Sequence, residues 1–217
     1  MLELIRQGVE INPHYRKITP MVADELARWG DWKNATWIWE SVLRSRPYIV
    51  AILTNVARGQ LAMGNIDSAL AYLERAKKLQ ARAPAVRSLE VMLLSRTGQA
   101  VRALELGREA INDNVVDFDL ANATFGLAWR AGDYALASKA MESRMTAWPA
   151  SRAEGLVQLG NMYASGAKDP ERALGAFRQA IALASEPERS ALMAQIPPEY
   201  RARLAEPATP QTSASKG

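Results

Sequence analysis

The pattern of the sequence Gly-Asp-Trp-Lys-Asn-Ala-Thr-Trp-Ile-Trp, residues 30–39, is repeated in a degenerate form along most of the chain. Its glycine recurs at intervals of 34 residues, at Gly30, Gly64, Gly98, Gly132 and Gly166. An alanine stands five residues after each of the first four glycines, at Ala35, Ala69, Ala103 and Ala137, and the fifth copy has Ala173, shifted by two. A fixed period of this length is the signature of a chain built from stacked structural repeats.

The repeated residue types predict a hairpin of two helices. Glycine adopts the left-handed backbone conformation in which helices often end. An Asp or Asn directly after it favours the start of the next helix, as at Asp31, Asn65 and Asp133. In the fifth copy, Asp169 followed by Pro170 has the same effect.

The alanine one turn into the second helix predicts a close contact between helices, because its side chain is small. Large apolar residues four positions later are expected to fill the space beside this contact. They are Trp39, Leu73, Met141 and Phe177. Gly107 takes this place in the third copy, which predicts thinner packing there.

Each unit therefore predicts a first helix (helix A), a tight turn and a second helix (helix B). The expected A helices cover about 18–29, 48–63, 85–97, 118–131 and 151–165, and the expected B helices about 32–45, 66–80, 100–113, 134–147 and 170–184. Ser151 with Glu154, and Ser185 with Glu188, match capping boxes. Sustained alternation of β-branched residues is missing from the sequence, so the expected fold class is all-α.

This pattern resembles the tetratricopeptide repeat (TPR) family, and the fifth unit matches that family's consensus best, with Leu159-Gly160, Tyr163, Ala173, Phe177 and Ala180. The resemblance covers about residues 1–184 and implies an α-α superhelix. We expect one TPR-like solenoid domain over 1–205, with repeats at about 16–49, 50–83, 84–117, 118–150 and 151–184 and capping helices at 186–205. Residues 206–217 carry no apolar period and are expected to form a disordered tail.

Residues 2–13 resemble a helix B whose helix A is missing. Either they form an N-terminal capping helix, or the chain is part of a longer protein. The residues 12–16, Asn-Pro-His-Tyr-Arg, and 28–32, Arg-Trp-Gly-Asp-Trp, also resemble the repeat region that follows the membrane spans of bacterial O-antigen ligases, polymerases and O-oligosaccharyltransferases. That resemblance implies a periplasmic domain, tethered to a membrane part upstream, that engages glycan or acceptor protein. A free-standing chain is instead expected in the cytoplasm.

The composition narrows the function classes. The 27 basic and 23 acidic residues leave a net charge of only +4, a weak signal for a nucleic-acid partner, and we expect none. The chain has no cysteine and one histidine, His14, which excludes thiolate and multi-histidine metal sites and a cysteine nucleophile. The longest near-apolar run, 48–57, is about half the length of a membrane span. We expect a non-catalytic chain without cofactor, metal or membrane span.

Candidate binding residues are expected on the A helices, because the TPR resemblance implies that these helices line a concave groove. Arg28, Arg96 and Arg130 each stand two residues before a repeat glycine, and Arg58 lies one turn earlier in its unit. Arginine binds carboxylate or phosphate through two hydrogen bonds, so these residues predict an acidic peptide, a free C-terminus or an anionic glycan as partner. Alternatively, cations in the last turn of a helix are stabilised by its dipole without a ligand.

The expected groove residues are Lys17, Asp24, Arg28, Thr54, Asn55, Arg58, Ser88, Met92, Arg96, Asn122, Trp129, Arg130 and Asn161. The family's clamp for C-terminal carboxylates would fall at Pro20, Asp24, Asn55, Ala85 and Leu89. Only Asn55 fits that clamp, so this mode of binding is rejected.

Four tryptophans, Trp29, Trp32, Trp37 and Trp39, lie within eleven residues. Trp39 is expected in the core, and Trp32 stands where the family often has an aromatic residue. Trp29 and Trp37 are expected to pack against the neighbouring unit. The alternative is that they stack on a sugar or anchor a partner.

Overall fold

The computed structural model describes residue 7 and residues 18–205, and every regular element within them is a helix, which confirms the all-α expectation. The A helices are α2 (Ile18–Arg28), α4 (Val50–Ala62), α6 (Pro84–Arg96), α8 (Phe118–Arg130) and α10 (Arg152–Asn161). The B helices are α3 (Trp32–Ser45), α5 (Ile66–Gln80), α7 (Ala100–Asn112), α9 (Tyr134–Ala147) and α11 (Pro170–Leu183). Two further helices follow, α12 (Glu186–Gln195) and α13 (Pro198–Ala205).

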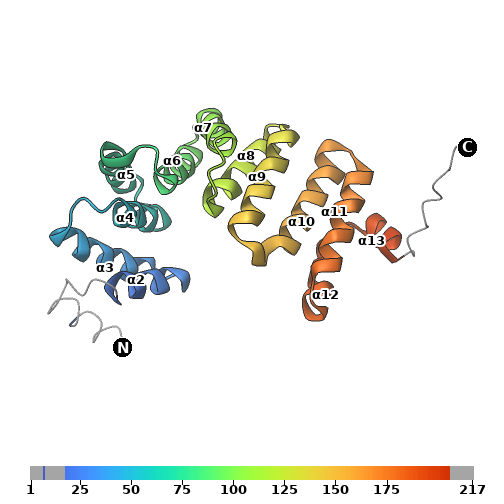
Figure 1. Ribbon diagram of the computed structural model, residues 1–217, viewed down its shortest axis with the longest axis horizontal. Helices are drawn as coiled ribbons and strands as arrows, with labels where there is room; N and C mark the ends of the chain where they lie inside the picture. Colours follow the sequence, from blue (N-terminus) through green and yellow to red (C-terminus); the bar gives the residue numbers. More distant parts are fainter. Residues whose placement is uncertain (1–6, 8–17, 206–217) are drawn as a thin grey trace, which may run out of the picture.

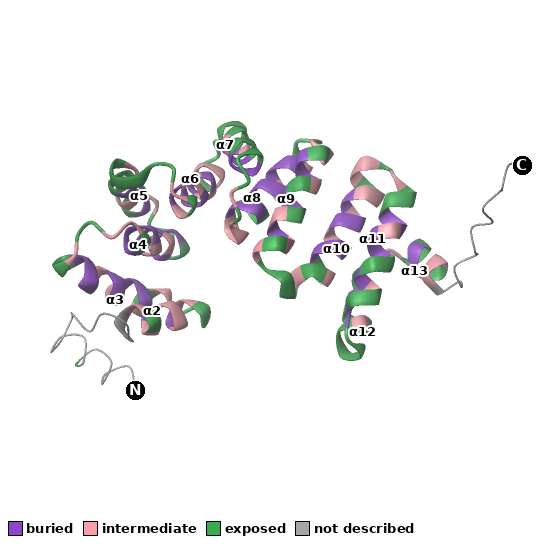
Figure 2. Ribbon diagram, in the orientation of Figure 1, coloured by how far each residue is buried: buried purple, intermediate pink, exposed green. Residues whose placement is uncertain are grey.

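The helices stack side by side in chain order and form an elongated array rather than a closed bundle (Figure 1). Each helix B packs on its own helix A. The first four B helices, α3, α5, α7 and α9, also pack on the helix A of the next unit. The five repeat alanines of the B helices, at 35, 69, 103, 137 and 173, are fully buried in these contacts. The buried faces turn toward neighbouring helices and the exposed faces turn outward (Figure 2). No unit buries its apolar face alone, as expected for a solenoid.

The turn between helix A and helix B follows the prediction in the first four units. Gly30, Gly64, Gly98 and Gly132 all have positive φ, between +75° and +83°. The carboxylates of Asp31 and Asp133 accept hydrogen bonds from the backbone N–H of Asn34 and Leu136, which caps α3 and α9. Asn65 differs, because its side-chain amide donates to Gln60 Oε1 and caps no helix.

The fifth unit departs from the prediction at its turn. Gly166 lies inside a π-helical segment, η2 (Met162–Ala167), and the left-handed residue is Lys168, with a φ of +52°. This segment adds two residues before the turn, which accounts for the shifted position of Ala173. Gly166 is needed for a different reason, since a Cβ atom there would lie 2.7 Å from Tyr134 Cε1.

Two further predictions about local packing are wrong. A Cβ atom on Gly107 would lie 2.5 Å from Thr124 Oγ1, so α7 approaches α8 more closely and the packing is not thinner. Ser151 belongs to a short 3₁₀ segment, η1 (Pro149–Ser151), and its hydroxyl donates to the Trp148 carbonyl rather than forming a capping box.

The C-terminal helices pack on the last repeat. Tyr200 of α13 contacts the buried ring of Phe177 with 5.2 Å between ring centroids, and Leu192 of α12 is buried in the same apolar cluster. At the start of α12 the backbone N–H and the hydroxyl of Ser185 both donate to Glu188 Oε2, which confirms the contact of Glu188 with the cap residue. The segments 1–6, 8–17 and 206–217, with His14 and Lys17, lie outside the described residues.

Candidate partner-binding surface

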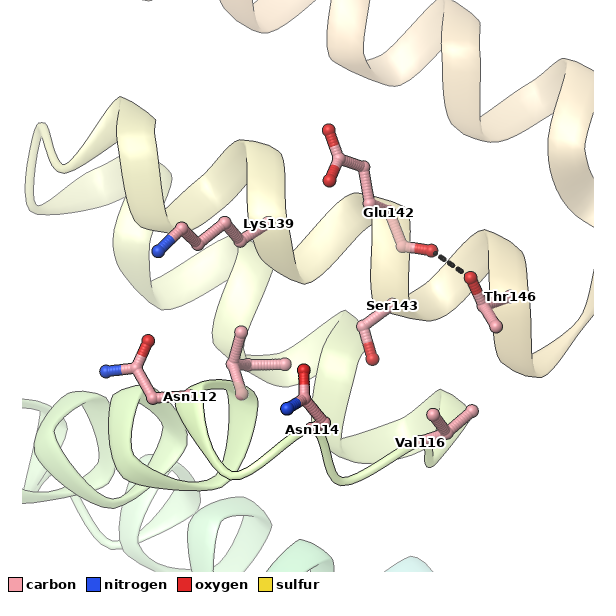
Figure 3. A pocket seen from close by; sticks show the side chains of 8 residues that line it. Asn112, Asn114, Val116, Lys139, Glu142, Ser143 and Thr146 are labelled. Carbon is pink, nitrogen blue, oxygen red and sulfur yellow. Dashed lines mark hydrogen bonds between the residues drawn. The ribbon is translucent and has the colours of Figure 1, made fainter.

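In the middle of the array, successive A helices lie against one another, whereas cavities open beside the B helices α5, α7 and α9. The helix α6 contacts both α4 and α8. A cavity of about 460 Å³ lies between α7 and α9, which also contact each other (Figure 3). Asn112 and Lys139 flank one end of this cavity, and Val116 and Thr146 flank the other. The surface on the other side of the array, which we call the A-helix face, is defined by polar side chains of the A helices that contact one another directly or through Arg144 of α9: Asp24, Asn55, Arg58, Asp119, Asn122 and Gln158.

At the first two units, Asp24 connects three helices. Its Oδ1 atom accepts hydrogen bonds from Trp39 Nε1 at 3.2 Å and from Asn55 Nδ2 at 3.3 Å. Desolvation by burial raises the pKa of Asp24, although the hydrogen bond from Trp39 and the charge of Arg28 oppose this shift. The predicted groove residues Asp24 and Asn55 are therefore adjacent.

In the middle of the face, Arg58 reaches across a whole repeat. Its Nη1 atom lies 2.8 Å from Asp119 Oδ2 at the start of α8, and Nη2 lies 3.8 Å from Asp117 Oδ2. Nη2 also donates to Ser88 Oγ of α6 at 3.4 Å. The two carboxylates compensate the charge of Arg58 within the chain.

The four predicted arginines are thus not equivalent. Arg28 is exposed and pairs with Glu25 at 2.9 Å, one turn earlier on the same helix. Arg96 and Arg130 are exposed and form no ion pair with any residue in the described part of the chain. Arg130 lies along α8, since its Nη1 atom is 3.8 Å from the position of a Cβ on Gly126. Of the four predicted arginines, Arg96 and Arg130 are therefore the two whose charge is exposed and unpaired within the described residues.

The other predicted groove residues fall into two groups. Thr54 and Ser88 are buried, and Thr54 Oγ1 donates to the Ala51 carbonyl, so neither side chain lines a surface. Met92, Trp129 and Asn161 are half-buried. Met92 packs on the first apolar cluster, Trp129 lies 5.5 Å from the Phe125 ring, and Asn161 Nδ2 donates to the Gln195 carbonyl of α12.

The tryptophans of the first unit are divided between core and surface. Trp39 is buried, as predicted, and Trp32 and Trp37 are half-buried against the apolar cluster of the first units. Trp29 is 73% exposed, so its predicted packing against a neighbouring unit is wrong. It follows the last residue of α2 and directly precedes the turn glycine Gly30.

One residue of this face was missed by the sequence analysis. Arg144 of α9 is only 3% exposed, and its Nη1 atom donates to Asn122 Oδ1 at 3.1 Å and to Gln158 Oε1 at 2.6 Å. Its guanidinium lies 5.2 Å from the centroid of the Phe118 ring. Burial lowers the pKa of Arg144, and the charge of Glu154 opposes this shift. The sequence does contain a signal for this residue: it is an arginine at a repeat position where other units have a buried Val or Ala.

Among the described residues, no group of three His, Cys, Asp or Glu side chains could hold a metal ion. Within the same part of the chain, no helix combines the length and the apolar character that crossing a membrane requires.

No protein-family model and no curated protein sequence matches this chain. Solved structures do. TTC0263, a thermophilic TPR protein in Thermus thermophilus, is 18% identical with a TM-score of 0.61, over 87% of this chain and 98% of that chain. MamA is 19% identical with a TM-score of 0.56, over 78% and 96%. YrrB, a TPR protein with an unusual peptide-binding site, is 15% identical with a TM-score of 0.53, over 89% and 98%. The resemblance to O-antigen ligase repeat regions stays a prediction. The chain has the tetratricopeptide-repeat fold.

Proposed function

We propose that the chain is a non-catalytic scaffold that binds a peptide, or an extended segment of a partner protein, along the A-helix face. The observation that carries this proposal is the series of polar contacts along that face: Asn55 with Asp24, Arg58 with Asp119, and Arg144 of α9 with Asn122 and Gln158. Because α6 lies against both α4 and α8, and Arg58 bridges α4 and α8, we infer that the array curves toward the A helices there and that these polar side chains line its concave side. Solenoids use such surfaces to bind extended partners.

The fold supports this choice of partner. YrrB, which shares the fold, is described as a TPR protein with a peptide-binding site. An extended peptide presents N–H and C=O groups that are not paired within it, and carboxamide side chains can both donate to and accept from them. Asn55 and Asn122 supply carboxamides from α4 and α8.

The charge of the face favours an acidic segment. Arg96 and Arg130 stand one repeat apart at the ends of α6 and α8, both exposed and both without an ion pair within the described part of the chain. Stabilisation by the helix dipoles explains their position but leaves their hydrogen-bond donors free. Carboxylates of an acidic peptide would use these donors.

Selection of peptides from a random library displayed on phage, with the full chain as target, tests the proposal. Dissociation constants of selected peptides are then measured at about 50 mM and about 300 mM salt for the wild type and for the double variant Arg96→Ala/Arg130→Ala. We expect acidic peptides, about tenfold weaker binding by the variant and a flatter salt dependence.

The matched control is Arg102→Ala/Arg178→Ala, which removes two exposed arginines from the B helices α7 and α11. It should bind like the wild type. A library that yields no binder, or binders that both double variants weaken equally, would contradict the proposal.

A further inference from the structure

Arg144 occupies a position at which the other repeats bury a small apolar residue. Counting from the turn, the same position holds Val42, Ala76 and Ala110, and Ala180 in the fifth unit when its two-residue shift is included. All four are buried, three of them fully. The fourth unit therefore buries a guanidinium in the interface between helices, where the other units bury an apolar side chain. Departures of this kind from a consistent pattern are expected at functional sites.

The hydrogen bonds of Arg144 leave one edge of its guanidinium free. Both bonds to the A helices, to Asn122 Oδ1 and to Gln158 Oε1, come from Nη1. Nε is buried and has no partner, and Nη2 donates to no residue in the described part of the chain. The Nε–H and one Nη2–H point in the same direction, and this pair matches the two oxygens of a carboxylate.

The positive charge is not compensated by an ion pair. No carboxylate in residues 18–205 pairs with Arg144, and Glu154 acts on it only through its charge. The side chain of Glu154 instead accepts a hydrogen bond from Gln158 Nε2 at 3.1 Å. A buried charge without a counter-ion is unfavourable, so an incoming carboxylate would gain more here than at an exposed arginine.

Asn122 marks the route to this guanidinium. Its side chain is exposed on α8 and its oxygen accepts a hydrogen bond from Nη1, so a ligand that approaches Arg144 from the surface of α8 would contact Asn122. Beside it, the Phe118 ring flanks the guanidinium and packs against Trp148, which is exposed. A carboxylate at Arg144 would thus have an amide donor and an aromatic surface next to it.

We propose that Arg144, with Asn122, binds a carboxylate of the partner peptide, either an Asp or Glu side chain or a C-terminus. This inference rests on the proposed function. It specifies one contact between the chain and the peptide, at Arg144 between α8 and α10. It differs from the Arg96 and Arg130 contacts because it is buried, so it should be specific for a carboxylate in one place and less sensitive to salt.

The first experiment detects the contact without a selected peptide. In the full chain labelled with ¹⁵N, the Nε–H signal of Arg144 is assigned by its loss in Arg144→Lys. Acetyl-glutamate amide and acetyl-alanine are titrated in parallel with acetyl-glutamine amide and acetyl-alanine amide. We expect the signal to shift with one or both acids and not with their matched amides. The two acids distinguish a side-chain carboxylate from a C-terminus.

The second experiment uses the selected peptides. Arg144→Ala introduces the residue of three other repeats, so the fold should be retained, as checked by circular dichroism. We expect it to weaken binding by about tenfold, while Arg178→Ala, on the exposed side of α11, leaves binding unchanged. Glu154→Gln should strengthen binding because it removes a competing carboxylate.

The outcomes separate the two proposals. Peptides that depend on Arg96 and Arg130 but bind Arg144→Ala normally would overturn this inference and leave the proposed function intact. A signal that responds to Glu154→Gln but to neither acid would show an internal ion pair and would also overturn it. A shift with an acid, in a chain from which no peptide is selected, would support the carboxylate site and contradict the proposed function.

Discussion

At the scale of single residues, two glycines that occupy the same repeat position in different A helices have different surroundings. Gly126 in α8 and Gly160 in α10 are 34 residues apart. A Cβ atom at Gly126 would meet only Arg130 Nη1, at 3.8 Å, whereas one at Gly160 would overlap the ring of Phe177. Phe177 is fully buried, so its ring has no room to move.

Opposite effects are therefore expected from two alanine substitutions. Gly126→Ala should raise the free energy of unfolding by about 0.5–1 kcal/mol, because alanine loses less backbone entropy in a helix. Gly160→Ala should lower it by about 1–3 kcal/mol through overpacking. Urea unfolding followed by circular dichroism measures both, and changes of the same sign would contradict the packing of α10 on α11.

The raised pKa of Asp24 predicts a dependence of stability on pH. Burial favours the protonated carboxyl in the folded chain, so its contribution to stability is complete below the pKa of the unfolded chain and is lost as the pH rises through the folded pKa. Asp24→Asn retains an oxygen acceptor for Trp39 Nε1 and does not ionise. We expect it to be more stable than the wild type at pH 7, with a difference that disappears below about pH 4. Urea unfolding at both pH values tests this, and a constant difference would contradict it.

At the scale of helices, the end of the fifth helix A is the element that departs from the repeat. Lys168 adopts the left-handed conformation that four glycines adopt in the other units, and a side chain there is strained. Lys168→Gly should therefore raise the free energy of unfolding by about 0.5–1 kcal/mol. Lys139→Gly, in the middle of α9, is the control and should lower it by about 1 kcal/mol. Thermal unfolding distinguishes the two, and destabilisation by Lys168→Gly would show that its side chain has another role.

The helices were predictable from sequence because their signals are local. A turn glycine, an aspartate cap and a buried alanine each act within a few residues, and all ten predicted A and B helices are present, nine of them within two residues of their expected bounds. The shift at Gly166 was not predicted, because the same glycine spacing arises from a contact with Tyr134 as well as from a turn. The candidate surface was predicted less well. Arg58 and Arg144 bind residues on other helices, and those contacts depend on how the units are rotated against one another.

At the scale of the whole molecule, Arg58 joins units that are not neighbours in sequence. Contacts in a solenoid normally link adjacent repeats only, so its curvature follows from many small rotations. The ion pair between Arg58 of the second unit and Asp119 at the start of the fourth passes over α6 and contacts Ser88 on the way. This bridge holds α4 and α8 at a fixed separation and so limits how far the A-helix face can open.

Loss of this bridge should change the shape of the chain more than its stability. The side chains of Arg58 and Asp119 are 24% and 40% exposed, so a double-mutant cycle with alanine at both positions should give a coupling of only about 0.2–1 kcal/mol, reduced by salt. Small-angle X-ray scattering should show a larger radius of gyration for Arg58→Ala than for the wild type. Arg28→Ala is the control, since its ion pair with Glu25 lies within one helix and places no restraint between units. An unchanged radius for Arg58→Ala, or an equal change for Arg28→Ala, would mean that packing between adjacent repeats alone sets the curvature. Asp119→Asn extends the argument to binding. It removes the closer of the two carboxylates that compensate the charge of Arg58, so it should strengthen the binding of an acidic peptide to the A-helix face.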